Sequence, residues 1–191
     1  MPAIRVPLPP QHSPRVAAML RYEMFDDPAN GVDEDSRISR VRAAFKTAAH
    51  EVRPRLFLGS YHAAAPAFLQ RAGVTHVLNC LDATAVAVGD HRTLTLDLED
   101  EPEQELPLRA ATDFIARALA EKGAVCLVHC AMGVSRSVAC VVAHLLRVEG
   151  GTVEGVLKSV RAARPQAAPN SGFLEQLCAW EAQLAAGRVN D

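Results

Sequence analysis

This chain of 191 residues lacks three features that would mark it as a membrane, nucleic-acid-binding or secreted protein. No run of 18 apolar residues occurs, so nothing predicts a membrane-spanning helix. The formal net charge is only −2, which gives no general attraction to nucleic acid or to an anionic membrane. No charged-then-apolar signal segment precedes the predicted fold. We therefore expect a protein of the cytoplasm or nucleus, with no nucleic-acid and no membrane partner.

The cysteines fit neither a disulfide framework nor a metal site. They are five in number, an odd count, and lie mainly in apolar segments, at Cys80, Cys126, Cys130, Cys140 and Cys178. Such a set suits a reducing compartment better than secretion. The cysteines lack the paired spacing of a zinc site, and the seven histidines form no close pair. We expect no metal and no other cofactor.

One segment carries a specific chemical signal. Residues 129–137 read His-Cys-Ala-Met-Gly-Val-Ser-Arg-Ser, which places Cys130 and Arg136 six positions apart. Residues 124–128 predict a buried strand before this loop, and residues 138–146 predict a buried helix after it. Backbone N–H groups at the start of a helix bind an anion, and a guanidinium adds two parallel hydrogen bonds to it. The positive electrostatic field of these groups also favours the ionised form of a cysteine. Gly133 permits the turn. The segment therefore predicts a phosphate-binding nucleophile, Cys130.

These residues resemble the signature of the cysteine-dependent protein phosphatases, and their sequence is most similar to that of the small, atypical dual-specificity phosphatases. Similarity extends through residues 50–60, 75–80 and 169–174. The resemblance implies that phosphotyrosine and phosphoserine or phosphothreonine in a phosphoprotein are hydrolysed through a phosphocysteine. It also implies a phosphate-binding loop made of Ala131, Met132, Gly133, Val134, Ser135 and Arg136.

The resemblance assigns roles to three further residues, each with a plainer interpretation beside it. Ser137 would donate a hydrogen bond to the Cys130 sulfur, or it would only cap a helix. Asn170 would order the loop from the side, or it would only start a helix, with Ser171 competing for that position. His129 would fix the backbone and tune the cysteine, or it would be a buried histidine that satisfies its own hydrogen bonds.

The leaving oxygen needs a proton donor, and two carboxylates compete for this role. The alternating residues 94–100 predict a half-buried strand that runs into an acidic loop. Asp100 fits the family pattern of apolar residues before and after the aspartate, and it precedes Cys130 by 30 residues. Asp97, 33 residues before Cys130, is the alternative. We predict Asp100 as the general acid, on a loop that moves.

Apolar periodicity predicts an α/β domain with a central, mostly parallel sheet flanked by helices, as in the cysteine-dependent phosphatases. Strands are expected near Leu56, Val77, Leu96 and Leu127. We divide the chain into an N-terminal extension (1–48), a catalytic domain (49–187) and a tail (188–191). The extension carries a predicted helix over residues 35–50. Oligomeric state is not predicted.

Cys80 ends an apolar strand segment, and in a parallel sheet that end would lie near Cys130. The two could form a reversible disulfide that protects Cys130 from over-oxidation. A buried packing cysteine is the alternative.

The five residues between Cys130 and Arg136 are uncharged, which suits a single phosphate monoester in a protein better than a densely charged ligand. Phosphoinositide and glucan substrates are the runners-up. A different class of function is a pseudophosphatase that binds phosphoproteins without turnover.

Overall fold

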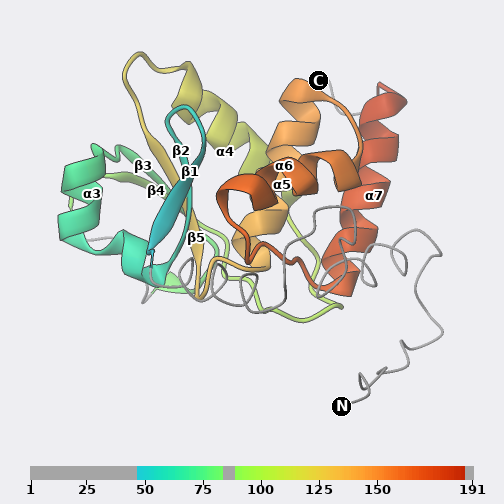
Figure 1. The fold of residues 1–191 in the computed structure, drawn as a ribbon, viewed down its shortest axis with the longest axis horizontal. Helices are drawn as coiled ribbons and strands as arrows, with labels where there is room; N and C mark the ends of the chain where they lie inside the picture. Colours follow the sequence, from blue (N-terminus) through green and yellow to red (C-terminus); the bar gives the residue numbers. More distant parts are fainter. Residues whose placement is uncertain (1–46, 84–88, 188–191) are drawn as a thin grey trace, which may run out of the picture.

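The computed structural model describes residues 47–83 and 89–187, which form one sheet with helices on both of its faces (Figure 1). The strands are β1 (Ala49–Arg53), β2 (Leu56–Ser60), β3 (His76–Asn79), β4 (Arg92–Thr95) and β5 (Cys126–Cys130). Their order across the sheet is β1-β2-β5-β3-β4. β1 and β2 pair antiparallel, and the other neighbouring pairs are parallel. The predicted α/β fold with a mostly parallel sheet is confirmed.

The central strand, β5, is buried along its whole length. Its sequence, Cys-Leu-Val-His-Cys, is typical of a parallel strand that is covered on both faces. Cys130 lies beside Ser60 of β2, and His129 lies beside Asn79 of β3. The carboxyl ends of these three strands therefore meet at one edge of the sheet, where ligands bind in such folds.

Helices cover the two faces unequally (Figure 1). One face carries the 3-10 helix η2 (Tyr61–Ala64) and α3 (Pro66–Ala72), over a small core. The other face carries α4 (Leu108–Ala120), α5 (Arg136–Glu149), α6 (Val153–Ala163) and α7 (Ser171–Ala185), over the larger core. Residues 137–146 of α5 are all buried, because α4, α6, α7 and the sheet surround this helix.

Two predicted element boundaries are wrong. The helix expected over residues 35–50 lies mostly outside the described residues, but Ala49 and His50 at its end belong to β1. There they pair with Gly59 and Leu58 of β2, and this pairing outweighs the helical pattern. The strand expected over 94–100 ends at Thr95. Beyond it Asp97 has a φ of 49°, a left-handed conformation that turns the chain out of the strand.

The division into extension, domain and tail stays a prediction, because residues 1–46 and 188–191 lie outside the described part of the chain. Across the described residues, no helix is long and apolar enough to cross a membrane.

Candidate active site

Cys130 is the last residue of β5, and its sulfur accepts two hydrogen bonds, one from the loop that follows and one from the first turn of α5. The backbone N–H of Gly133 donates to Sγ at 3.2 Å, and Oγ of Ser137 donates to it at the same distance. Both donors stabilise negative charge on the sulfur. The side chain is buried, with 1% of Cys130 exposed, so this charge would sit in a medium that water screens little.

The backbone conformation and the close neighbours of residue 133 require a glycine there. Its φ is 65°, and a Cβ there would lie 2.5 Å from the carbonyl oxygen of Gly59 in β2 and 2.5 Å from Nη2 of Arg164. The loop thus rests directly on β2 and on a buried guanidinium, and no larger side chain fits.

Arg136 is the first residue of α5 and lies between the phosphate loop and the acidic loop. Its Nη1 donates to the carbonyl oxygen of Leu98 at 3.0 Å, and its Nε lies 3.5 Å from Oδ2 of Asp100. Only 12% of its side chain is exposed. The guanidinium is therefore held in place before any phosphate arrives, which reduces the entropy that binding must remove.

The two candidate acids differ in their surroundings. Asp100 lies beside Arg136, and its Oδ1 accepts a hydrogen bond from Nδ2 of Asn170 at 3.1 Å. Asp97 is exposed, as Asp100 is, but no side chain among the described residues bonds to the Asp97 carboxylate. Asp100 is thus the candidate acid that lies beside Arg136.

Asn170 connects three parts of the site. Its Oδ1 caps α7 by accepting the N–H of Phe173 at 2.9 Å, so Asn170 and not Ser171 is the cap. Its own N–H donates to Oγ of Ser135 in the phosphate loop at 3.0 Å. With its bond to Asp100, this residue ties α7, the phosphate loop and the acidic loop together.

His129 lies within the sheet immediately before Cys130 and is completely buried. Burial lowers its pKa to about 4, and the backbone of Cys130 opposes this shift only in part. The ring is therefore neutral at pH 7, and it supplies no positive charge to the neighbouring sulfur.

Arg164 and Gln176 are two site residues that sequence reasoning missed. Arg164, at the end of α6, donates through Nε to the carbonyl oxygen of Gly133 at 2.7 Å and through Nη2 to that of Met132 at 2.9 Å. Gln176 of α7 bonds to the backbone of Leu106 and Gln104, which follow the acidic residues. An arginine or glutamine on a helix is normally a surface residue, so the sequence offered no signal for either role.

Arg164 adds positive charge close to the Cys130 sulfur. It is 1% exposed, and burial lowers its pKa to about 10, whereas the charge of Cys130 acts in the opposite direction. The guanidinium therefore stays protonated at pH 7.

Cys80 lies at the predicted edge of the sheet, where its N–H donates to the carbonyl oxygen of His129 at 2.9 Å. Its sulfur lies 3.9 Å from Sγ of Cys140 in α5, and both residues are completely buried. The contact with Cys140 and burial raise the pKa of Cys80 well above its ordinary value. Cys140 is thus a second sulfur within reach of Cys80, which the sequence did not indicate.

No group of three or more histidine, cysteine, aspartate or glutamate side chains is placed to hold a metal ion within residues 47–83 and 89–187. The groups of the site that could bind an anion are backbone N–H groups of the loop and the guanidinium of Arg136.

Known proteins share these features. Residues 56–183 match the family described as "Dual specificity phosphatase, catalytic domain". Dual specificity protein phosphatase 26 of Bos taurus is 37% identical over 162 residues, which cover 78% of this chain and 76% of that protein. Dual specificity protein phosphatase 22-B of Danio rerio is 38% identical, over 67% of this chain and 71% of that protein. The crystal structure of human DUSP28 superimposes with a TM-score of 0.64 at 36% identity, and covers 73% of this chain and 96% of that one.

Proposed function

We propose, from the premise that this chain belongs to the dual specificity phosphatase family and is a cysteine-based protein phosphatase, that Cys130 forms a phosphocysteine with phosphotyrosine, phosphoserine and phosphothreonine substrates. The observation that carries the proposal is the Cys130 sulfur, which accepts two hydrogen bonds at 3.2 Å inside a loop that ends in Arg136. Metal independence is typical of the family, and this chemistry calls for no metal.

In the first step, the Cys130 thiolate attacks phosphorus while the phosphate oxygens are bound by the loop N–H groups and Arg136. The sulfur–phosphorus bond forms as the bond to the leaving oxygen breaks, and that oxygen receives a proton from Asp100. The contacts of Asp100 with Arg136 and Asn170 support this assignment over Asp97.

In the second step, water attacks the phosphocysteine and gives its proton to the Asp100 carboxylate. The new bond to oxygen forms as the sulfur–phosphorus bond breaks, which releases inorganic phosphate and regenerates the thiolate. Ser137 assists here, because its hydroxyl donates a hydrogen bond to the departing sulfur.

Single phosphate monoesters on proteins are the substrates that the loop favours. Residues 131–135 carry no charge, so Arg136 and the backbone neutralise one phosphate group and little else. Phosphoinositides and phosphorylated glucans are poorer candidates on this ground. The five free cysteines support a reducing compartment, and hence a cytoplasmic or nuclear location.

Hydrolysis of p-nitrophenyl phosphate in the presence of EDTA tests the proposal directly. We expect the wild-type chain to turn over and Cys130→Ser to be at least about 10³-fold slower, because the serine hydroxyl is a far weaker nucleophile at neutral pH. Phosphopeptide binding, measured by calorimetry, is the control, since the serine variant should retain it. A wild-type chain that binds phosphopeptide without turnover would identify a recognition module instead.

Cys80 is proposed as the resolving cysteine for Cys130. Peroxide oxidises the Cys130 thiolate to a sulfenic acid, and the Cys80 thiol displaces water from it to form a disulfide. Mass spectrometry after mild peroxide treatment should detect a Cys80–Cys130 linkage, and Cys80→Ser should be inactivated irreversibly. The Cys140→Ser variant is the control for the neighbouring sulfur. Exclusive Cys80–Cys140 linkage, with wild-type recovery of Cys80→Ser after reduction, would contradict the assignment.

A further inference from the structure

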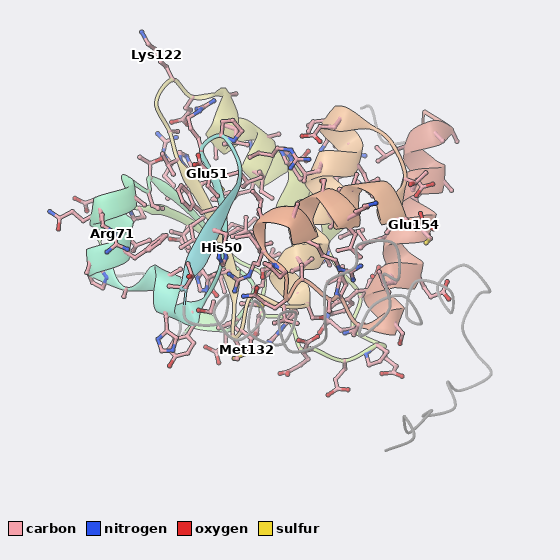
Figure 2. All side chains as sticks on the ribbon, viewed as in Figure 1. His50, Glu51, Arg71, Lys122, Met132 and Glu154 are labelled. Carbon is pink, nitrogen blue, oxygen red and sulfur yellow. The ribbon has the colours of Figure 1, made fainter. Side chains whose placement is uncertain are left out.

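Arg164 connects the phosphate loop to a histidine of β1. Two branches of its guanidinium donate to the carbonyl oxygens of Met132 and Gly133, at 2.9 and 2.7 Å. The third branch, Nη1, contacts Nδ1 of His50 at 2.9 Å. Figure 2 shows His50 on strand β1, beside α6, and Met132 at the edge of the molecule where the phosphate loop lies. His50 is half-buried, so this contact is partly shielded from water.

The contact between His50 and Arg164 defines the protonation state of the imidazole. A guanidinium nitrogen only donates hydrogen bonds, so Nδ1 of His50 must accept. The ring is therefore neutral and carries its hydrogen on Nε2. A protonated ring would offer a second donor at Nδ1 and would place two positive charges in contact.

The chain of hydrogen bonds continues from Arg164 to the nucleophile. The carbonyl of Met132 and the N–H of Gly133 belong to one peptide group, and that N–H donates to Sγ of Cys130 at 3.2 Å. A cation that bonds to the carbonyl polarises the peptide group and strengthens its N–H as a donor. His50, Arg164, this peptide group and the Cys130 sulfur thus form one continuous series of contacts.

We propose that His50 is a positioning residue for the nucleophile: in its neutral form it holds Arg164 against the phosphate loop, and its protonation releases that hold. The inference rests on the proposed function, because it concerns the thiolate that the reaction uses. His50 touches neither the phosphate loop nor the sulfur and acts only through Arg164.

Among residues 47–83 and 89–187, Arg164 is the charged group that faces His50. On β1 itself, Glu51 accepts the backbone N–H of Arg55, and Arg53 is bound to Glu149. On β2, the residue opposite His50 is the apolar Leu58.

On α6, Lys158 is exposed and Arg161 donates to the carbonyl oxygen of Ala167. Burial and the charge of Arg164 lower the pKa of His50, so the ring is neutral at pH 7 and gains its proton only in acid.

The test compares the full-length wild type with His50→Ala, His50→Gln and the control His91→Gln, whose histidine precedes β4 at the opposite end of the sheet. The rate of Cys130 alkylation by iodoacetate, followed from pH 4.5 to 8, reports the thiolate without requiring turnover. The kcat and KM for p-nitrophenyl phosphate are measured over the same range, and thermal unfolding reports stability.

We expect His50→Ala to lose about five- to tenfold in kcat/KM at pH 7, since one hydrogen bond to a charged group is removed. Its alkylation midpoint should move to higher pH. His50→Gln, whose Oε1 can still accept from Arg164, should keep the wild-type alkylation midpoint. It should lack the fall in alkylation rate and kcat/KM that protonation of His50 produces in acid. His91→Gln should match the wild type throughout.

Two results would overturn the inference. One is that both His50 variants keep the alkylation midpoint and the kcat/KM of the wild type. The other is an equal loss in His50→Ala and His50→Gln that follows their thermal stability, with an unchanged pH profile, because packing alone would then explain it. A wild type that lacks turnover but shows the His50-dependent alkylation curve would refute the proposed reaction and leave the role of His50 standing.

Discussion

The proposed reaction needs a carboxylate beside the bound phosphate, and at the residue scale the contacts of Asp100 with Arg136 and Asn170 hold it next to the loop that would bind the phosphate. In the proposed mechanism the same contacts would orient Asp100 for both steps, first as acid and then as base. Asp97, three residues earlier, has the same chemistry without the contacts. Position therefore separates two otherwise equivalent side chains.

The Asp100→Asn variant should lose about 10²–10⁴-fold in kcat on a phosphoserine peptide, because an amide cannot protonate a poor leaving group. The basic limb of the pH profile should disappear with it. Asp97→Asn is the matched control and should stay within about twofold of the wild type in the same steady-state assay. A larger loss in Asp97→Asn than in Asp100→Asn would reverse the assignment.

At the scale of elements, the N-terminus of α7 sets the position of the acidic loop. Gly172 packs against the backbone of Pro102, and a Cβ on Gly172 would lie 1.9 Å from the Pro102 carbonyl oxygen. Gln176, one turn further along α7, bonds to Leu106 and Gln104. α7 thus buries an apolar stripe and also supports the loop that bears Asp100.

The Gly172→Ala variant should displace the acidic loop, because the added Cβ would overlap the Pro102 backbone and only a shift of that backbone relieves the overlap. We expect kcat on a phosphoserine peptide to fall at least about tenfold and the free energy of unfolding to fall by about 1–3 kcal/mol. Urea unfolding and steady-state kinetics measure the two effects. Gly155→Ala, in the first turn of α6, is the control: its Cβ would lie 3.3 Å from Oγ1 of Thr152, far from the acidic loop, so the kinetics should stay at the wild-type level. Wild-type kinetics in Gly172→Ala would show that the loop does not depend on this contact.

At the scale of the whole molecule, buried histidines make stability depend on pH. Burial lowers the pKa values of His129 and His144 to about 4, whereas both titrate near 6.5 in the unfolded chain. Between these values the unfolded state binds more protons than the folded state, so stability is fully present above pH 6.5 and is lost as pH falls toward 4.

Urea unfolding should therefore show a loss of up to roughly 2 kcal/mol per histidine between pH 7 and pH 5. His144 lies in α5, away from the phosphate loop, so His144→Gln separates this effect from catalysis. The variant should lose less stability than the wild type over that interval, even if it is less stable at pH 7. An equal loss in both proteins would assign the pH dependence to other groups.

The structure also explains which predictions failed. The 94–100 segment alternates as a strand does, but Asp97 turns the backbone and ends β4 at Thr95. Ala49 and His50 were expected in a helix, and their pairing with β2 is a long-range interaction that local pattern does not reveal. Arg164 gave no signal, because its burial depends on carbonyl oxygens more than 30 residues away in the chain.

The sequence by itself determined the fold class and predicted Cys130 as the nucleophile and Arg136 as the phosphate-binding residue, because a strand, a short loop and a helix bring these residues together locally. Only the tertiary structure decided what surrounds them. Asp100, Asn170 and Arg164 come from separate elements and meet around the loop only in the packed fold, and His50 joins them through Arg164. Contacts within one short segment can be inferred from residue spacing, whereas contacts between distant segments depend on packing that spacing does not encode.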